Sequence, residues 1–208
     1  MLSEAVVRVV ASSRHARGRE RMESSIERVL PRILGEVKEV IEKVSQAEVE
    51  ALADAIMHAE GVFLCGAGRV GISSRALAMR LVHMGKQTHW VNDDTTPGIG
   101  SNDLLIANSG SGGSASTYNT VSQAKEAGSK IATITANPEG KIALFADVVL
   151  VLPAQTYKIG KSDWSSILPM GSQFELCLWI LQDILCLTLS EKMGITEAQM
   201  SARHRNLE

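Results

Sequence analysis

The chain after residue 60 alternates between short apolar runs and segments with helical periodicity. The apolar runs are residues 62–65, 88–91, 104–107, 130–135 and 148–152. Helices are expected between them over 72–84, 117–127 and 141–145. Strands that lack a polar face must be covered on both sides. The pattern therefore predicts an α/β fold, with a parallel sheet between two layers of helices and right-handed crossovers.

Two helices are expected before the first strand. Apolar residues recur every three or four positions over 22–43, which predicts an amphipathic helix. Ser45 and Glu48 have the capping-box spacing, so a second helix is expected to begin there and to end near Gly61.

Two more helices are expected after the last strand. A long apolar helix should span 171–193 with Gly194 as its cap, and Thr196 with Gln199 forms a capping box that starts a short terminal helix. No change in composition marks an internal boundary, so residues 22–208 are expected to form a single domain.

Composition and charge narrow the classes of partner. The net charge of −2 provides no basic field for nucleic acid. The apolar stretch 176–189 is short and carries polar residues at its middle, so no membrane span is expected. Cys65, Cys177 and Cys186 lie in apolar runs without CxxC spacing. They are expected to be buried thiols of a cytoplasmic protein and not a disulfide frame or a zinc site.

Residues 1–21 differ from the rest of the chain because they are basic and rich in serine. Five arginines fall within this segment, at positions 8, 14, 17, 19 and 21. A poorly ordered extension is the favoured interpretation, because chain termini are commonly untethered. A targeting or docking arm is the alternative.

The stretch from Asn108 to Ser116 has the composition of an anion cradle. It reads Asn-Ser-Gly-Ser-Gly-Gly-Ser-Ala-Ser, and it lies between an apolar run and a helical pattern. Glycines let backbone N–H groups approach an oxyanion, serines add donors, and a helix N-terminus adds partial positive charge. A phosphate is the expected guest, although a flexible Ser/Gly turn would have the same composition.

A second glycine loop, Gly66-Ala67-Gly68-Arg69-Val70-Gly71, follows the first expected strand. Alone it fits the GxGxxG pattern of dinucleotide-binding proteins, with Asp93 or Asp94 as the ribose-binding acid. A nicotinamide-dependent oxidoreductase is therefore one hypothesis. However, two anion-friendly loops on neighbouring strands suit one small phosphorylated substrate better. Arg69 would then hold a sugar oxygen or an enediolate, or it forms only a surface ion pair.

Two further side chains are candidates for acid–base catalysis. Glu175 lies near the start of a strongly apolar helix, where a carboxylate is costly unless it faces a polar cavity or a partner. It is either a general base or a first-turn carboxylate that the helix dipole stabilises. His204 lies in the polar terminal segment, where sequence alone favours no special role.

Together these motifs resemble the 6-phospho-3-hexuloisomerase branch of the sugar isomerase (SIS) domain family. The resemblance runs from about Met22 to Glu208. It rests on five segments: 66–69, the Thr96-Pro97 turn, 109–112, 171–175 and 202–204. It implies a three-layer, flavodoxin-like α/β/α sandwich with a five-stranded parallel sheet, usually assembled as a homotetramer. It also implies a metal-free and cofactor-free isomerisation of D-arabino-3-hexulose 6-phosphate to fructose 6-phosphate in the ribulose monophosphate route.

The resemblance also assigns roles to residues. It implies that the serine loop binds the substrate phosphate, that Gly68 and Arg69 lie beside the substrate, and that Glu175 moves a proton through an enediol intermediate. His204 would reach into a neighbouring subunit's pocket. The phosphate-binding residues of that loop are Ser109, Ser111, Gly112 and Ser114.

Two positions depart from the family pattern. Val70 stands where the family commonly has serine, and Gly113 stands where it commonly has glutamate. These departures keep two alternatives open: a non-catalytic phosphosugar sensor, and an isomerase of another ketose phosphate.

Overall fold

Five parallel strands form one sheet in the order β2-β1-β3-β4-β5. The protein was analysed as a computed structural model that describes residues 24–157 and 166–207. The strands are β1 (Gly61–Gly66), β2 (Gln87–Trp90), β3 (Leu104–Asn108), β4 (Lys130–Thr135) and β5 (Val148–Val151). All five expected strands are confirmed, with ends that differ by at most one residue. The basic extension expected at 1–21 lies outside the described residues.

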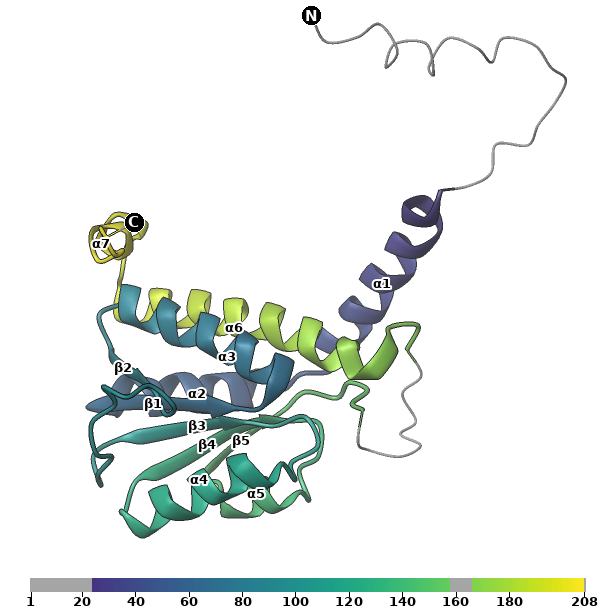
Figure 1. The fold of residues 1–208 in the computed structure, drawn as a ribbon. Helices are drawn as coiled ribbons and strands as arrows, with labels where there is room; N and C mark the ends of the chain where they lie inside the picture. Colours follow the sequence, from purple (N-terminus) through teal and green to yellow (C-terminus); the bar gives the residue numbers. More distant parts are fainter. Residues whose placement is uncertain (1–23, 158–165, 208) are drawn as a thin grey trace, which may run out of the picture.

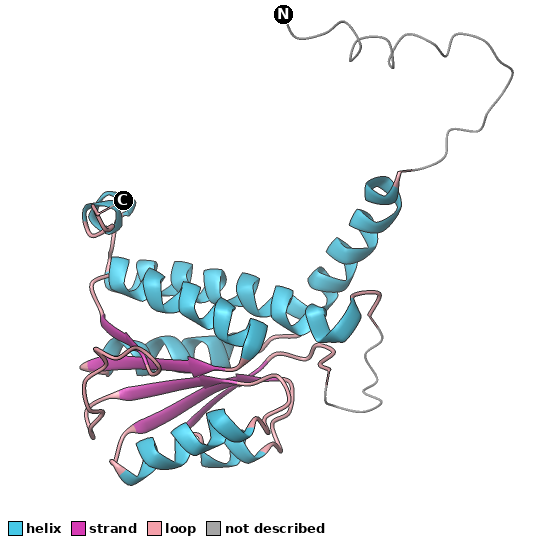
Figure 2. Cartoon of the chain, in the orientation of Figure 1, coloured by secondary structure: helices cyan, strands magenta, loops and turns pink. Residues whose placement is uncertain are grey.

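Helices cover both faces of the sheet, which confirms the three-layer arrangement (Figures 1 and 2). One face carries α2 (Gln46–His58), α3 (Gly68–His83) and α6 (Ser172–Met193), with α1 (Ser25–Ile41) packed against α6. The other face carries α4 (Ala115–Glu126) and α5 (Lys141–Phe145). A 3-10 turn, η1 (Pro169–Gly171), leads into α6, and α7 (Glu197–Ala202) ends the described chain.

The central strands β1, β3 and β4 read as largely apolar runs because each contributes to two cores. In β1, Val62 and Leu64 pack into the core under α2, α3 and α6, whereas Phe63 and Cys65 pack into the core under α4 and α5. Successive side chains of a strand point to opposite faces, so both faces of such a strand are buried, and the polar residues in them, such as Asn108 and Thr133, are hydrogen-bonded.

The helix after the first glycine loop begins at Gly68, four residues earlier than expected. Gly71 lies in its first turn, directly against the end of β1. A Cβ atom at Gly71 would lie 2.5 Å from the carbonyl oxygen of Gly66. The last glycine of the GxGxxG-like pattern is therefore required by close helix–strand packing, whatever ligand the loop binds.

Only half of the capping box expected at Ser45 forms. The Ser45 Oγ accepts a hydrogen bond from the Glu48 backbone N–H (3.4 Å). The Glu48 carboxylate instead accepts a hydrogen bond from the Val151 N–H (2.8 Å), so it links α2 to β5. The capping box expected at Thr196 and Gln199 is confirmed.

Helix α6 is a core helix of the fold. Its length and composition would allow it to cross a membrane, but half of its most apolar 18-residue stretch is buried inside the protein. Its C-terminus is capped by Gly194 in the left-handed conformation, as expected. Helix α1 differs because only Val37 and Val40 are buried, with Ile33 and Ile41 packed partly against the core, while its N-terminal part projects from the body of the domain (Figure 1).

Candidate functional site

A pocket of about 370 Å³ lies at the carboxyl ends of β1 and β3. Its walls are built by residues 67–70, 108–111, 156–157, 170–171 and 174–175, together with Ser114. Ligands of open parallel sheets bind at this edge, and the volume falls in the range of small-molecule sites. Both glycine-containing loops singled out in the sequence open into this pocket.

The three long helices that begin at this pocket lack a side-chain cap. The caps of α3, α4 and α6 are Ala67, Ser114 and Gly171, and none of them makes a side-chain capping hydrogen bond. By contrast α1, α2 and α7 are capped by Ser24, Ser45 and Thr196, away from the pocket. The short α5 is also uncapped. Backbone N–H groups and the positive ends of three helix dipoles therefore surround the pocket, which favours a bound anion.

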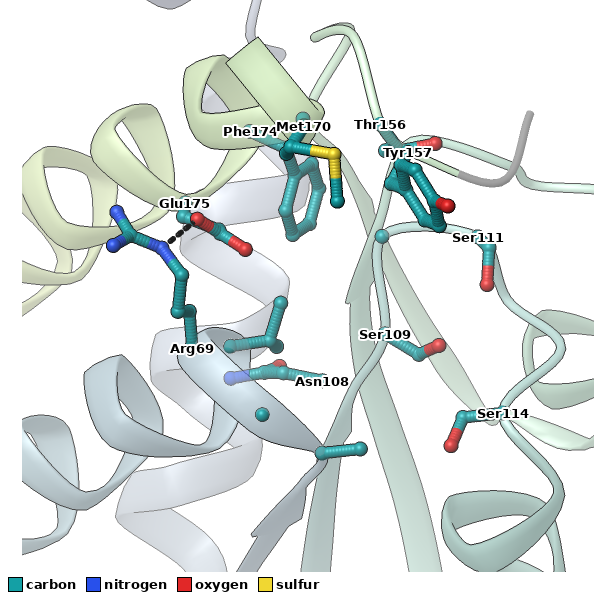
Figure 3. Close-up of a pocket in the computed structure, with 15 residues that line it drawn as sticks. Arg69, Asn108, Ser109, Ser111, Ser114, Thr156, Tyr157, Met170, Phe174 and Glu175 are labelled. Carbon is teal, nitrogen blue, oxygen red and sulfur yellow. Dashed lines mark hydrogen bonds and ion pairs between the residues drawn. The ribbon is translucent and has the colours of Figure 1, made fainter. Parts of the chain in front are cut away.

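Ser109, Ser111 and Ser114 lie along one wall of the pocket (Figure 3). Ser109 is buried, and its N–H donates to the Ile134 carbonyl (3.2 Å), which ties the loop to β4. The Ser114 Oγ lies 3.3 Å from the Ser116 Oγ. None of the backbone hydrogen bonds of the described loops has the N–H of Ser111 or Ser114 as its donor, so both N–H groups can donate to a ligand.

Gly112, which was grouped with these serines, does not line the pocket. Its N–H donates to the Ser109 carbonyl (3.0 Å), and a Cβ atom there would lie 3.0 Å from the Gly140 Cα. Gly112 shapes the turn that carries the serines, and its own N–H is already used.

Arg69 and Glu175 lie on the wall of the pocket opposite the serines, and their side chains point toward each other (Figure 3). The Arg69 Nε donates to the Glu175 carboxylate in an ion pair between the first turns of α3 and α6. The Glu175 side chain is 17% exposed and the Arg69 side chain 68% exposed. Glu175 is therefore neither an isolated carboxylate nor a simple surface group: it lines the pocket with a cation beside it.

Asn108 is a buried pocket residue for which sequence reasoning assigned no role. Its Nδ2 donates to the Ser74 Oγ (3.0 Å), and its Oδ1 accepts from the Ile134 N–H (3.1 Å). The Ser74 Oγ in turn donates to the Val70 carbonyl (2.8 Å). Asn108 thus joins α3 and β4 beneath the two loops. The available signal was an amide residue at the end of an otherwise apolar strand.

Phe174 was also missed as a pocket residue. It is buried between the serine loop and residues 155–157, and a Cβ atom at Gly110 would lie 3.0 Å from its ring and 2.9 Å from Thr156. Tyr157 and Met170 lie nearby and are exposed. The unusual length of the connection at 153–168 is a sequence signal that it borders a site, and Thr156 and Tyr157 do line the pocket. No motif singles out individual residues of this wall, because it is assembled from segments that follow β5 and precede α6.

His204 does not line the pocket of its own chain. It lies after α7, where its ring packs against the ring of His83 with centroids 5.0 Å apart. The neighbouring Arg203 donates to the His83 carbonyl (3.3 Å), which holds the terminal segment on α3. Of the two departures from the family pattern, Val70 lines the pocket and also packs against the core, and Gly113 is exposed.

Within residues 24–157 and 166–207, no three His, Cys, Asp or Glu side chains are grouped so that they could hold a metal ion.

Comparisons with known proteins agree with this geometry. A family model described as SIS domain matches residues 55–178. A protein of Bacillus subtilis (strain 168) named 3-hexulose-6-phosphate isomerase is 37% identical over 176 residues, which cover 85% of this chain and 95% of that protein. A protein of the same name from Mycobacterium gastri is 36% identical and covers 83% of this chain and 86% of its own. A crystal structure of a Methanococcus jannaschii protein, described as inferring a 3-hexulose-6-phosphate isomerase function, superposes with a TM-score of 0.76 at 29% identity, over 87% of this chain and 99% of its own.

Proposed function

The chain belongs to the SIS domain family, and on that premise we propose that it is a phosphosugar isomerase that converts D-arabino-3-hexulose 6-phosphate to fructose 6-phosphate through an enediol intermediate. One observation carries the proposal. A single pocket combines an anion-binding wall with an ion-paired carboxylate at the carboxyl edge of the sheet. The relatives named for this reaction align over most of the chain, which supports the choice of sugar.

The substrate phosphate binds in the serine loop. Ser109, Ser111 and Ser114 donate to its oxygens, and the unpaired N–H groups at the start of α4 add further donors. The support for this assignment is the absence of any acidic residue in the first turns of α3 and α4, together with their missing caps. A dianion placed there is stabilised by both helix dipoles.

Glu175 transfers the proton between the adjacent carbons. Its carboxylate takes the proton from C2, which gives an enediol between C2 and C3 with a hydroxyl oxygen on each carbon. The proton is then returned to C3, and the C2 oxygen becomes the new carbonyl oxygen. The proton lost from the C2 hydroxyl goes to the C3 oxygen, so no redox partner or cofactor is needed. The half-buried position of Glu175 on the pocket wall supports this role.

Arg69 stabilises the negative charge that develops on the enediol oxygens. Its guanidinium already lies beside Glu175, and the Gly68 backbone brings the first turn of α3 to the same side. Removing a single donor to a developing oxyanion costs about 3–4 kcal/mol of transition-state stabilisation, and a preorganised cation at the place where negative charge develops should contribute on the same scale.

The test is turnover of 3-hexulose 6-phosphate by the purified protein, with formation of fructose 6-phosphate as the readout. Turnover of another ketose phosphate in place of this one would keep the enzyme class and change the sugar. Absence of turnover on every ketose phosphate, with sugar phosphate still bound in calorimetry, would contradict an isomerase.

A phosphosugar sensor without catalysis is the second candidate, because Val70 and Gly113 provide no side-chain donor in the two loops. The two candidates differ in proton exchange. An isomerase incorporates deuterium at the substrate carbon when the reaction is run in deuterated water. A sensor binds the sugar phosphate and leaves its carbon-bound hydrogen unexchanged.

The active form is a cytoplasmic homotetramer that works in the ribulose monophosphate route. Apolar side chains that would suit subunit contacts are exposed on the helices. They are Ile26, Leu30 and Leu34 on α1, Ile72, Met79 and Val82 on α3, and Leu176, Trp179 and Leu187 on α6. His204 then assists at the pocket of a neighbouring subunit. Three free cysteines without a disulfide among them support a reducing compartment. Burial raises the pKa of Cys65 and Cys186 to about 12 and that of Cys177 to about 11, so these thiols are unreactive.

A further inference from the structure

Helix α1 contributes one carboxylate to the interior of the fold, although most of the helix projects from the domain. Glu36 accepts a hydrogen bond from the Ser166 Oγ, one from the Ile167 N–H (3.0 Å) and one from the Gln173 Nε2 (3.3 Å). These donors lie more than 125 residues away along the chain. Three donors on one carboxylate form a far more specific contact than an ordinary surface ion pair.

The donors to Glu36 belong to a closed network around the start of α6. The Gln173 Oε1 accepts from the Gln155 N–H (2.7 Å), and the Gln155 Oε1 accepts from the Ser166 N–H (2.7 Å). The Phe174 N–H donates to the Gln155 carbonyl (3.3 Å). The network therefore ties residue 155, the segment at 166–168 and the first turn of α6 to one another through α1.

This network lies directly behind one wall of the pocket. Thr156 and Tyr157 follow Gln155, and Glu175 is two residues after Gln173. Gly171, in a left-handed conformation (φ 78°), fits against this wall so closely that a Cβ atom would lie 2.5 Å from the Tyr157 nitrogen. A shift of the segment that contains Gln155 would therefore displace the pocket wall and the turn that carries Glu175 together.

The serine loop is held by different contacts. Asn108 and Ser109 bond to Ile134 on β4, and the Gly110 carbonyl accepts from the Ala136 N–H (3.1 Å). None of these contacts involves Glu36. The phosphate-binding wall and the wall that carries Glu175 are thus positioned by separate sets of hydrogen bonds, and they meet where Gly110 packs against Thr156 and Phe174.

We infer that Glu36 is a positioning residue for the isomerisation: through Ser166, Ile167 and Gln173 it fixes the wall formed by Thr156 and Tyr157 and the turn of α6 that carries Glu175. The inference rests on the proposed function for its kinetic consequence. It makes a helix outside the sandwich part of the active-site architecture.

The first test is the kinetics of Glu36→Ala. Its kcat is expected to fall about 10- to 100-fold, because small misplacements of a reacting group are costly. Its KM should change less than about threefold, since the phosphate wall keeps its own contacts. Glu36→Gln keeps one acceptor oxygen and should recover part of the lost kcat. The matched control is Glu42→Gln at the C-cap of the same helix, whose exposed carboxylate forms an ion pair with Lys38 (3.7 Å) and which should behave as wild type.

A double-mutant cycle with Ser166→Ala tests whether Glu36 acts through this segment. Glu36→Ala combined with Ser166→Ala should be no slower, within about twofold, than Glu36→Ala alone, because residues of one network are not additive. Multiplying effects, an unchanged kcat in Glu36→Ala, or a loss of activity fully explained by global unfolding would each overturn the inference.

Hydrogen exchange provides a readout that does not need catalysis. In Glu36→Ala the amides of Gln155 and Phe174 should exchange faster than in Glu42→Gln, while those of β3 and β4 keep their protection. If the wild-type protein isomerises no sugar phosphate, the proposed function fails and this exchange result still decides the structural role of Glu36. Unchanged exchange at Gln155 and Phe174 would contradict that role.

Discussion

At the scale of single residues, the pocket depends on side chains whose partners lie far away in the sequence. Asn108 is fully buried and bonds both to Ser74 on α3 and to the Ile134 N–H on β4. Removing it leaves a buried N–H without an acceptor and a hydroxyl without a donor. Such groups cost more than the net contribution of the hydrogen bond itself.

Asn108→Ala should lower the free energy of unfolding by about 2 kcal/mol and should weaken sugar-phosphate binding, since Ser109 follows directly. Urea denaturation and calorimetry measure the two effects. Asn119→Ala, at an exposed position of α4, is the control and should leave both unchanged or slightly raise stability. A stability like that of wild type would show that the Asn108 network is dispensable.

Sequence reasoning recognised the residues of the pocket that belong to local motifs. Ser109, Ser111, Ser114, Gly68, Arg69 and Glu175 all line it, because glycine and serine loops after parallel strands converge at one sheet edge. The length of the connection at 153–168 predicts a loop that borders a site, but sequence reasoning singled out none of Thr156, Tyr157 and Phe174, because their positions depend on how the segment after β5 folds against α6. An ion pair for Arg69 and a partner for Glu175 were among the alternatives from sequence, but that the two pair with each other was not predicted, because they lie 106 positions apart.

At the scale of helices and strands, the uncapped start of α4 is the feature that links stability to binding. Ser114 occupies the N-cap position with extended backbone angles (φ −62°, ψ 122°) but makes no side-chain capping bond. An acidic residue there would satisfy orphan N–H groups and complement the dipole. It would also place a negative charge where the phosphate is proposed to bind.

Ser114→Asp is therefore expected to raise the free energy of unfolding by about 0.5–1 kcal/mol and to weaken sugar-phosphate binding more than Ser114→Ala does. The paired readouts are thermal unfolding without ligand and calorimetry with fructose 6-phosphate. Equal affinities in the two variants would argue that the phosphate binds away from the α4 N-terminus.

A second link between elements titrates with pH. Asp147 accepts hydrogen bonds from the Lys125 Nζ (2.8 Å) and from the Ile131 N–H (2.8 Å), which connects α4 and β4 to the start of β5. Burial alone would raise the pKa of this carboxyl, but these hydrogen bonds outweigh it and hold the pKa below its usual value of 3.8. A carboxyl with a lowered folded-state pKa adds stability above its unfolded pKa and loses it as the pH falls through the folded value.

Asp147→Asn should be less stable than wild type by about 1 kcal/mol at pH 7, an amount typical of partly exposed charged hydrogen bonds. The difference should shrink as the pH falls below about 4, where the wild-type carboxyl takes up its proton. Urea midpoints between pH 3 and pH 7 measure this. A difference that is constant across this range would exclude the carboxylate charge as its cause.

Helices and strands were predictable where a periodic pattern or a cap fixed them. The five strands and the Gly194 cap follow directly from such patterns. The start of α3 did not, because its first turn consists of a glycine loop that becomes helical only by packing against β1. The side chain of Glu48 was misplaced for a similar reason: a long-range donor, the Val151 N–H, competes with the local capping bond.

At the scale of the whole molecule, the exposed apolar surface of α1 is where we propose that subunits meet. Ile26, Leu30 and Leu34 recur one turn apart and are 70%, 48% and 57% exposed on a helix that projects from the domain (Figure 1). Exposed apolar stripes of this kind mark interaction sites. A second copy of the chain is the partner that the proposed tetramer requires.

Leu30→Glu combined with Leu34→Glu should reduce the mass measured by light scattering from that of four 22.4-kDa chains to a smaller species. Activity should fall with it, because His204 would lose its proposed place at a neighbouring pocket. The corresponding control swaps the charges of the exposed ion pair at the end of this helix, with Lys38→Glu and Glu42→Lys. A monomeric wild-type protein at micromolar concentration would contradict the tetramer.

The central claim is that one pocket holds the phosphate on its serine wall while Glu175 moves the proton on the other. Glu175→Gln tests it most directly, because the amide keeps the shape of the side chain and cannot take up the proton. Turnover of 3-hexulose 6-phosphate should fall by about 10²–10⁴-fold, and the affinity for fructose 6-phosphate, measured on the same preparation, should stay within about threefold of wild type. Turnover that is undiminished in Glu175→Gln would contradict the account.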